Sequence, residues 1–127
     1  MSSNQNDKRE FLRYRCDKPV NFKILFSPKD KKAASKILNG ISKNLSVSGI
    51  LFASDTLPEI SSIIALDLDY RTTVICQEIE EKVLIFDNKL IGKVVRIEES
   101  DDGTYNVGVA FIKKTDQISP EIKELLK

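Results

Sequence analysis

The chain of 127 residues contains no histidine, no tryptophan, one methionine and two cysteines. Histidine is the usual general base near neutral pH and the commonest metal ligand, so its absence argues against acid–base catalysis and against a metal site. The sequence also lacks a Walker A loop, a GxGxxG motif and any cluster of cysteines. These absences favour a non-enzymatic protein that holds neither a metal nor a cofactor.

The sequence also lacks features of secreted and membrane proteins. Cys16 and Cys76 are far apart and form no CxxC motif, which is typical of reduced thiols in the cytoplasm. No apolar run approaches the roughly 20 residues that a membrane-spanning helix needs. Residues 1–7 are polar after Met1 and lack the apolar stretch of a secretory signal. We therefore expect a cytoplasmic protein with a flexible tail over residues 1–7 and no membrane insertion.

Charge is distributed unevenly, although the net charge is only +1. Residues 1–43 carry 11 Lys and Arg against 4 Asp and Glu, whereas residues 44–127 carry 9 against 15. A positive N-terminal third attracts a small polyanion, but a pI near 7.7 gives little support for non-specific binding to DNA or RNA. A simpler explanation stays open for the lysines between residues 29 and 36, namely that they solubilise an exposed loop over residues 27–35.

Short segments with alternating apolar and polar residues predict an all-β fold. In the first of them, Val20, Phe22, Ile24 and Phe26 alternate with more polar neighbours. Many short strands of this kind predict a closed antiparallel barrel in a single domain. The expected strands are Pro19–Phe26, Ile37–Leu45, Gly49–Ala53, Ser62–Tyr70, Thr72–Glu78, Lys82–Phe86, Lys89–Glu98 and Thr104–Ile112.

Turn and cap signals complete this scheme. Asp101-Asp102-Gly103 is typical of a hairpin turn between the last two strands. Ser119 followed by Pro120 and Glu121 combines an N-cap residue, a proline at the first helical position and an acid in the first turn. This combination predicts a short C-terminal helix over residues 119–127.

Two motifs carry candidate chemistry. Arg9 and Arg13 precede the first long strand, and Asn44, Ser46 and Gly49 surround a later tight bend. A guanidinium is a planar fork that matches phosphate oxygens or the O6/N7 edge of guanine with two bonds. Asparagine can accept from the N–H groups of guanine, serine can donate and accept, and glycine leaves the bend free of a side chain. The motifs predict a clamp for a guanine nucleotide.

RxxxR followed by NxSxxG resembles the signature of the PilZ family, which binds the second messenger cyclic di-GMP. Similar flanking segments at Pro19-Val20, Ile91–Val95 and Val107–Phe111 extend the resemblance over residues 8–113. It implies one domain over residues 8–127, with a ligand-binding arm at 8–18 and a six-stranded antiparallel barrel at 19–113. The segment from residue 69 to 90 is longer than the family usually has there, so we expect an inserted hairpin near residues 73–86.

The resemblance also implies ligand contacts. Arg9 and Arg13 would bind phosphate and the Hoogsteen edge of guanine, Asn44 and Ser46 would contact the base or phosphate from the barrel, and Gly49 would keep the bend open. Lys8 stands where many relatives carry another arginine, and it supplies charge without a planar fork. Outside the motif, Arg15 is a possible helper. The implied function is that of a receptor whose surface changes for a protein partner when cyclic di-GMP binds.

Other interpretations of the same residues stay open. The two arginines of the first motif can be ordinary surface residues, and Asn-x-Ser-x-x-Gly commonly only shapes a turn. A PilZ-like barrel can also serve as a protein-interaction adaptor that ignores the nucleotide. A small barrel that binds single-stranded nucleic acid is a further class, but it uses surface aromatics for stacking. Here the relevant phenylalanines fall on predicted core positions: Phe22, Phe26, Phe52 and Phe111.

Overall fold

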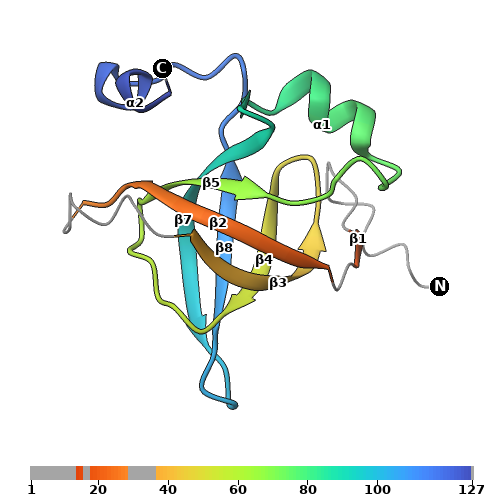
Figure 1. Ribbon diagram of the computed structural model, residues 1–127, viewed down its shortest axis with the longest axis vertical. Helices are drawn as coiled ribbons and strands as arrows, with labels where there is room; N and C mark the ends of the chain where they lie inside the picture. Colours follow the sequence, from red (N-terminus) through yellow and green to blue (C-terminus); the bar gives the residue numbers. More distant parts are fainter. Residues whose placement is uncertain (1–13, 16–17, 29–36, 127) are drawn as a thin grey trace.

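A computed structural model describes residues 14–15, 18–28 and 37–126 (Figure 1). Antiparallel strands close into a six-stranded barrel in the order β3-β2-β5-β7-β8-β4, and β4 pairs again with β3. The predicted fold class, an all-β barrel with a short C-terminal helix, is confirmed. The barrel strands are β2 (Pro19–Phe26), β3 (Ile37–Leu45), β4 (Gly49–Ser54), β5 (Ile63–Asp67), β7 (Lys89–Glu99) and β8 (Tyr105–Phe111).

Two further strands among the described residues add to the sheet without entering the barrel. β1 (Tyr14–Arg15) pairs with the end of β3, and β6 (Ile85–Phe86) pairs with the beginning of β7. Each has only two residues. The first of them places Tyr14 and Arg15 beside Asn44 and Leu45 at the end of β3.

Alternation along the strands fills the barrel with apolar side chains. On β2, Val20 and Phe22 are buried while Pro19 and Asn21 are exposed. The rings of Phe22 and Phe52 meet inside the barrel with their centroids 4.9 Å apart. A strand that buries one face is expected to show this period of two, and the predicted core positions of Phe22 and Phe52 are confirmed.

Phe26 departs from the expected core. A β-bulge between Ile24 and Phe26 shifts the register of β2 against β5, and a bulge changes the face to which the following side chains point. Phe26 packs instead in a second apolar cluster on the outside of the barrel. The prediction that all four phenylalanines lie in the barrel core was wrong for this one.

The second cluster lies beneath α2 (Pro120–Leu125). Ser119 caps this helix, since its Oγ accepts a hydrogen bond from the backbone N–H of Ile122 at 3.4 Å. Ile122 and Leu126 then pack against the outer face of β5 and its neighbours. Because α2 covers the outer face and the core covers the inner one, four successive residues of β5 are buried: Ile63, Ile64, Ala65 and Leu66.

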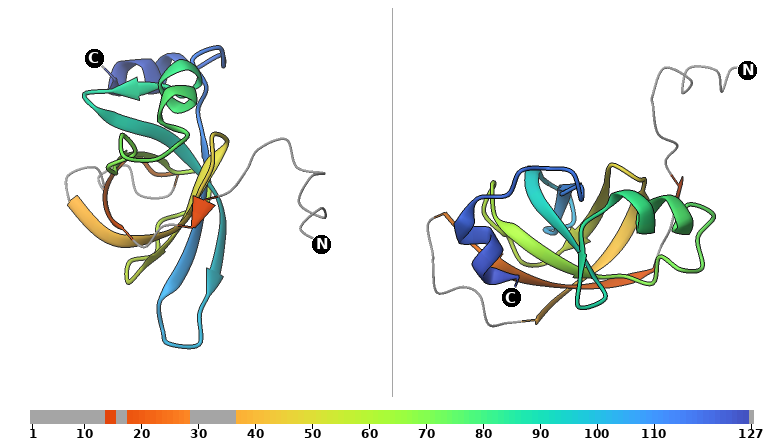
Figure 2. Two further views of the ribbon diagram at one scale, coloured as in Figure 1. Left: turned by 90° about the vertical axis from the view of Figure 1, so that its right-hand side faces the viewer. Right: turned by 90° about the horizontal axis from the view of Figure 1, so that it is seen from above.

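The segment between β5 and β7 corrects the sequence-based prediction. The expected strands Thr72–Glu78 and Lys82–Phe86 do not form an inserted hairpin, because the segment contains α1 (Cys76–Lys82) followed by the short β6. Ile75, Ile79 and Val83 recur every four residues and are all buried, which is the pattern of one helix face. Both helices lie toward the same end of the barrel, and the β7–β8 hairpin projects from the opposite end (Figure 2).

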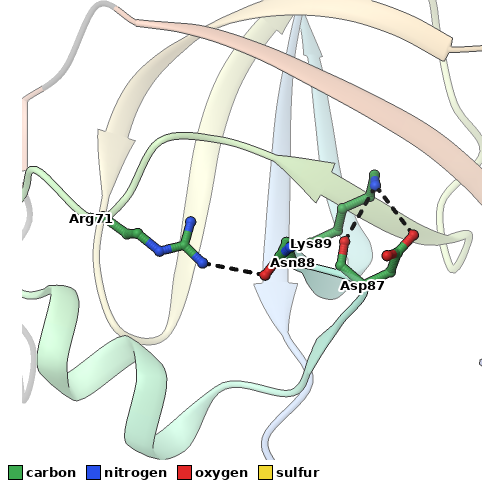
Figure 3. Close-up of polar contacts among 4 residues, drawn as sticks. All are labelled: Arg71, Asp87, Asn88 and Lys89. Carbon is green, nitrogen blue, oxygen red and sulfur yellow. Dashed lines mark hydrogen bonds and ion pairs between the residues drawn. The ribbon is translucent and has the colours of Figure 1, made fainter.

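Polar contacts join the β6–β7 turn to the connection between β5 and α1 (Figure 3). Asp87 and Asn88 have φ values of 55° and 63°, as a type I′ hairpin turn requires. The ammonium of Lys89 lies 3.7 Å from the carboxylate of Asp87. Arg71, from the connection between β5 and α1, donates to Asn88 Oδ1 at 3.4 Å. The connection between β5 and α1 is therefore in contact with the β6–β7 turn.

Candidate functional site

The bend between β3 and β4 is built around Ser46, which is buried. Its Oγ accepts hydrogen bonds from the backbone N–H groups of Ser48 at 3.2 Å and Gly49 at 3.3 Å. Its own N–H donates to the carbonyl of Gly49 at 2.9 Å, and the hydroxyls of Ser46 and Ser48 are 2.9 Å apart. The serine of the NxSxxG motif thus has a structural role in the turn, as one of the open interpretations proposed.

Gly49 is required because β4 passes very close to β8. A Cβ added at Gly49 would lie 2.2 Å from the carbonyl oxygen of Val109, far inside normal contact. Positive φ is not the reason, since Gly103 alone among the described glycines has it, at +86°. Steric clash, and not backbone conformation, therefore explains the glycine at this position.

A hollow of about 320 Å³ opens on the outer face of the barrel at this bend. Asn44, Ser46 and Gly49 line it from one side, so the structure brings the three predicted turn residues together. The facing part of β8 contributes Gly108 and Ala110. The hollow exists because these outward positions of β8 carry almost no side chain.

Strand register arranges the hollow in one row across five strands. Arg15 of β1 is the register partner of Asn44, Asn44 is that of Leu51, Leu51 is that of Gly108, and Gly108 is that of Arg96 on β7. The positions of Asn44, Leu51, Gly108 and Arg96 thus lie on the same face of the sheet. This row of register partners therefore extends from β1 to Arg96 on the far side of the hollow.

Arg96 forms that far wall and was not anticipated from the sequence. Its guanidinium pairs with the carboxylate of Glu98 at 2.8 Å, and the two side chains are 67% and 54% exposed. No short motif surrounds Arg96. Only the strand register, which depends on pairing between distant segments, identifies it as a neighbour of the bend.

Lys18, the residue before β2, is hydrogen-bonded to β3. The backbone carbonyl of Lys18 accepts two hydrogen bonds from Ser42, one from the N–H at 2.8 Å and one from Oγ at 2.9 Å. The ammonium of Lys18 also donates to the hydroxyl of Thr72, which lies between β5 and α1. The predicted ligand contacts Lys8, Arg9 and Arg13 lie outside the residues that the structure describes, as does most of the predicted loop over residues 27–35.

A second hollow, of about 540 Å³, lies between α2 and the barrel. Its walls are mainly apolar, with Phe26, Ile63 and Ile122 among them, and Lys93 and Asp116 at its edge. It contains none of the motif residues and continues the apolar cluster under α2.

Within residues 14–15, 18–28 and 37–126, no group of three or more His, Cys, Asp or Glu side chains is placed to hold a metal ion. In the same part of the chain, no helix has the length and apolar character needed to cross a bilayer.

Comparisons with known proteins found one family model and several solved structures that are similar to this chain. A family model described as "PilZ domain" matches residues 7–127. The PilZ domain of CeSA from a cellulose-synthesizing bacterium is 13% identical with a TM-score of 0.42, over 91% of this chain and 94% of that one. The PilZ domain of YcgR from Escherichia coli, solved with c-di-GMP, is 12% identical with a TM-score of 0.45, over 94% and 86%. No curated protein matches significantly.

Proposed function

The chain belongs to the PilZ domain family, and from this premise we propose that it is a non-catalytic receptor for cyclic di-GMP. One observation carries the proposal. Asn44, Ser46 and Gly49, which fill the NxSxxG motif, gather around a single hollow on the barrel. β1 runs beside Asn44 at this same place and directly follows the RxxxR segment in the chain.

Covalent connection supports a role for the first motif. Arg13 is bonded to Tyr14, whose register partner is Leu45, and successive Cα atoms of a trans peptide are about 3.8 Å apart. The RxxxR segment thus leads directly into the strand that pairs with Leu45 at the bend. We assign Arg13 and Arg9 to the phosphates and the guanine Hoogsteen edge, with Lys8 adding positive charge beside them.

The barrel supplies the other half of the proposed clamp. The side-chain amide of Asn44 faces the hollow and can accept from guanine N–H groups. Ser46 keeps the bend in shape, and Gly49 leaves its surface free of a side chain. A volume of about 320 Å³ is near the lower end for small-molecule sites, which span roughly 300–1,000 Å³. The hollow thus holds part of the ligand, and the segment with the two arginines covers the rest.

In this proposal, a protein partner recognises the barrel surface that changes when cyclic di-GMP binds. Ile37 and Ile41 are 72% and 48% exposed on β3, and they are apolar side chains that such a partner could contact. The same observation supports the second candidate, an adaptor that binds a protein regardless of the nucleotide. The two candidates differ in one measurable respect, which is whether the purified protein binds cyclic di-GMP.

Isothermal titration calorimetry with cyclic di-GMP tests the proposal. Wild-type protein should bind, and Arg9→Ala and Arg13→Ala should each weaken binding by about tenfold or more, because a bidentate arginine contact is worth roughly 1–3 kcal/mol. Lys31→Ala, from the same basic third of the chain, is the matched control and should bind like wild type. No heat at either low or physiological salt would refute receptor function and leave the adaptor.

A further inference from the structure

We infer that Arg96 is an additional ligand-contacting residue of the hollow, and that Glu98 competes with the ligand for its guanidinium. The inference rests on the proposed function and extends it to the wall opposite the bend. It assigns to β7 a planar cationic group for a phosphate or a guanine edge, which neither sequence motif supplies.

The position of Arg96 is the first argument. It lines the same hollow as Asn44 and Ser46 and occupies the same register row, with Leu51 and Gly108 between. Neighbouring strands are about 4.8 Å apart, so Asn44 and Arg96 are roughly 14 Å apart along the sheet. A ligand with two guanines and two phosphates can contact the groups at both ends of such a row.

The local backbone of β7 is the second argument. A register shift between Val94 and Arg96 leaves Val95 as an extra residue, 52% exposed. Bulges of this kind redirect a side chain, and here Arg96 is brought opposite Gly108. A Cβ at Gly108 would lie 3.3 Å from the Cβ of Arg96. The glycine therefore gives the arginine stem space against the floor of the hollow.

The ion pair with Glu98 is the third argument. The two residues are two positions apart on one strand, so both side chains face outward, and their charged atoms are 2.8 Å apart. A solvent-exposed pair is held weakly, and its partner can be exchanged. A phosphate or guanine edge offers the guanidinium a two-bond contact in a partly enclosed site, which is stronger than an exposed ion pair. Glu98 also repels an anionic ligand.

Titrations with cyclic di-GMP test this assignment with four variants. Arg96→Gln should weaken binding by about tenfold to a hundredfold, as for loss of one bidentate contact. Arg96→Lys should lose part of this, because it keeps the charge and lacks the fork. Glu98→Gln should tighten binding by roughly twofold to fivefold, because it removes both the competitor and the repulsion. Arg71→Gln is the matched control, an exposed arginine outside the hollow, and should bind like wild type.

The outcomes separate the inference from the proposed function. Wild-type affinity in Arg96→Gln, together with lost binding in Arg13→Ala, would overturn the role of Arg96 and leave the receptor intact. Weaker binding by Glu98→Gln would overturn the competition. Failure of the wild-type protein to bind would overturn both proposals. Thermal melts of each variant check that the barrel is folded, so that any loss of affinity is a property of the hollow.

Discussion

Gly49→Ala is the substitution that the geometry predicts to be most damaging at the bend. The added Cβ would lie 2.2 Å from the carbonyl oxygen of Val109, whereas real Cβ atoms essentially never come within 3.0 Å. The obstacle is backbone, which cannot rotate away. The beginning of β4 therefore has to move about 0.8 Å from β8, and the ladder between Gly49 and Ala110 is disturbed.

The expected cost follows from two contributions. Overpacking of this kind costs about 1–3 kcal/mol, and one weakened backbone hydrogen bond costs about 1 kcal/mol more. Gly49→Ala should therefore lower the free energy of unfolding by about 2–4 kcal/mol, a large part of the 5–15 kcal/mol typical of a domain. Gly108→Ala is the matched control on the facing strand. Its Cβ meets a side-chain atom of Arg96 at 3.3 Å, and removal of glycine from the unfolded chain returns about 0.4–1 kcal/mol, so its net effect should be close to zero.

Urea denaturation followed by circular dichroism measures both variants. With a slope of about 1–3 kcal/mol per molar urea, the midpoint of Gly49→Ala should fall by about 1 M or more while that of Gly108→Ala hardly changes. A loss below about 1 kcal/mol for Gly49→Ala, with unchanged slope, would show that β4 separates easily from β8. The close approach would then not determine the shape of the hollow.

Three further changes probe other parts of the molecule. Burial raises the pKa of Tyr70 above its ordinary value of 10.0, so its contribution to stability is present below pH 10 and lost as pH rises through the folded-state pKa. Urea titrations should show stability falling more steeply above about pH 10 in wild type than in Tyr70→Phe, and parallel curves would contradict this. Ser46→Ala removes the acceptor of two turn N–H groups and should cost about 1–2 kcal/mol in urea denaturation; unchanged stability in Ser46→Ala would show that the bend does not depend on Ser46. Ser119→Ala removes the cap of α2 and should cost about 0.5–1 kcal/mol by thermal melting, and an unchanged melting temperature would mean that packing alone holds the helix.

Local pattern predicted the fold where one face of a strand is buried. β2 and β3 begin and end at the predicted residues, because alternation and flanking turn residues mark both ends. The region from residue 72 to 86 was assigned wrongly, since it was divided into two strands where the structure has α1 followed by the short β6. The spacing of Ile75, Ile79 and Val83 on one helix face was the signal that could have identified α1.

The candidate site was only partly accessible from the sequence. The motif residues Asn44, Ser46 and Gly49 could be selected from their chemistry and spacing, and their contact with a ligand stays a prediction. Arg96 could not be selected, because its place beside them depends on a bulge in β7 and on pairing with β8. Such non-local register is a property of the folded sheet and leaves no short pattern in the chain.

The pairing of β4 with β8 has a consequence for how the protein is made. Leu51 and Gly108 are register partners from opposite halves of the chain, and contacts of this kind form late because closing a long loop costs entropy. Consider a nascent chain that has emerged from the ribosome only as far as Ala53. It contains the bend and Ser46, but it lacks β8 and β7, which supply the floor and the far wall of the hollow. The proposed ligand site should therefore be complete only after β8 has been synthesised and has paired with β4.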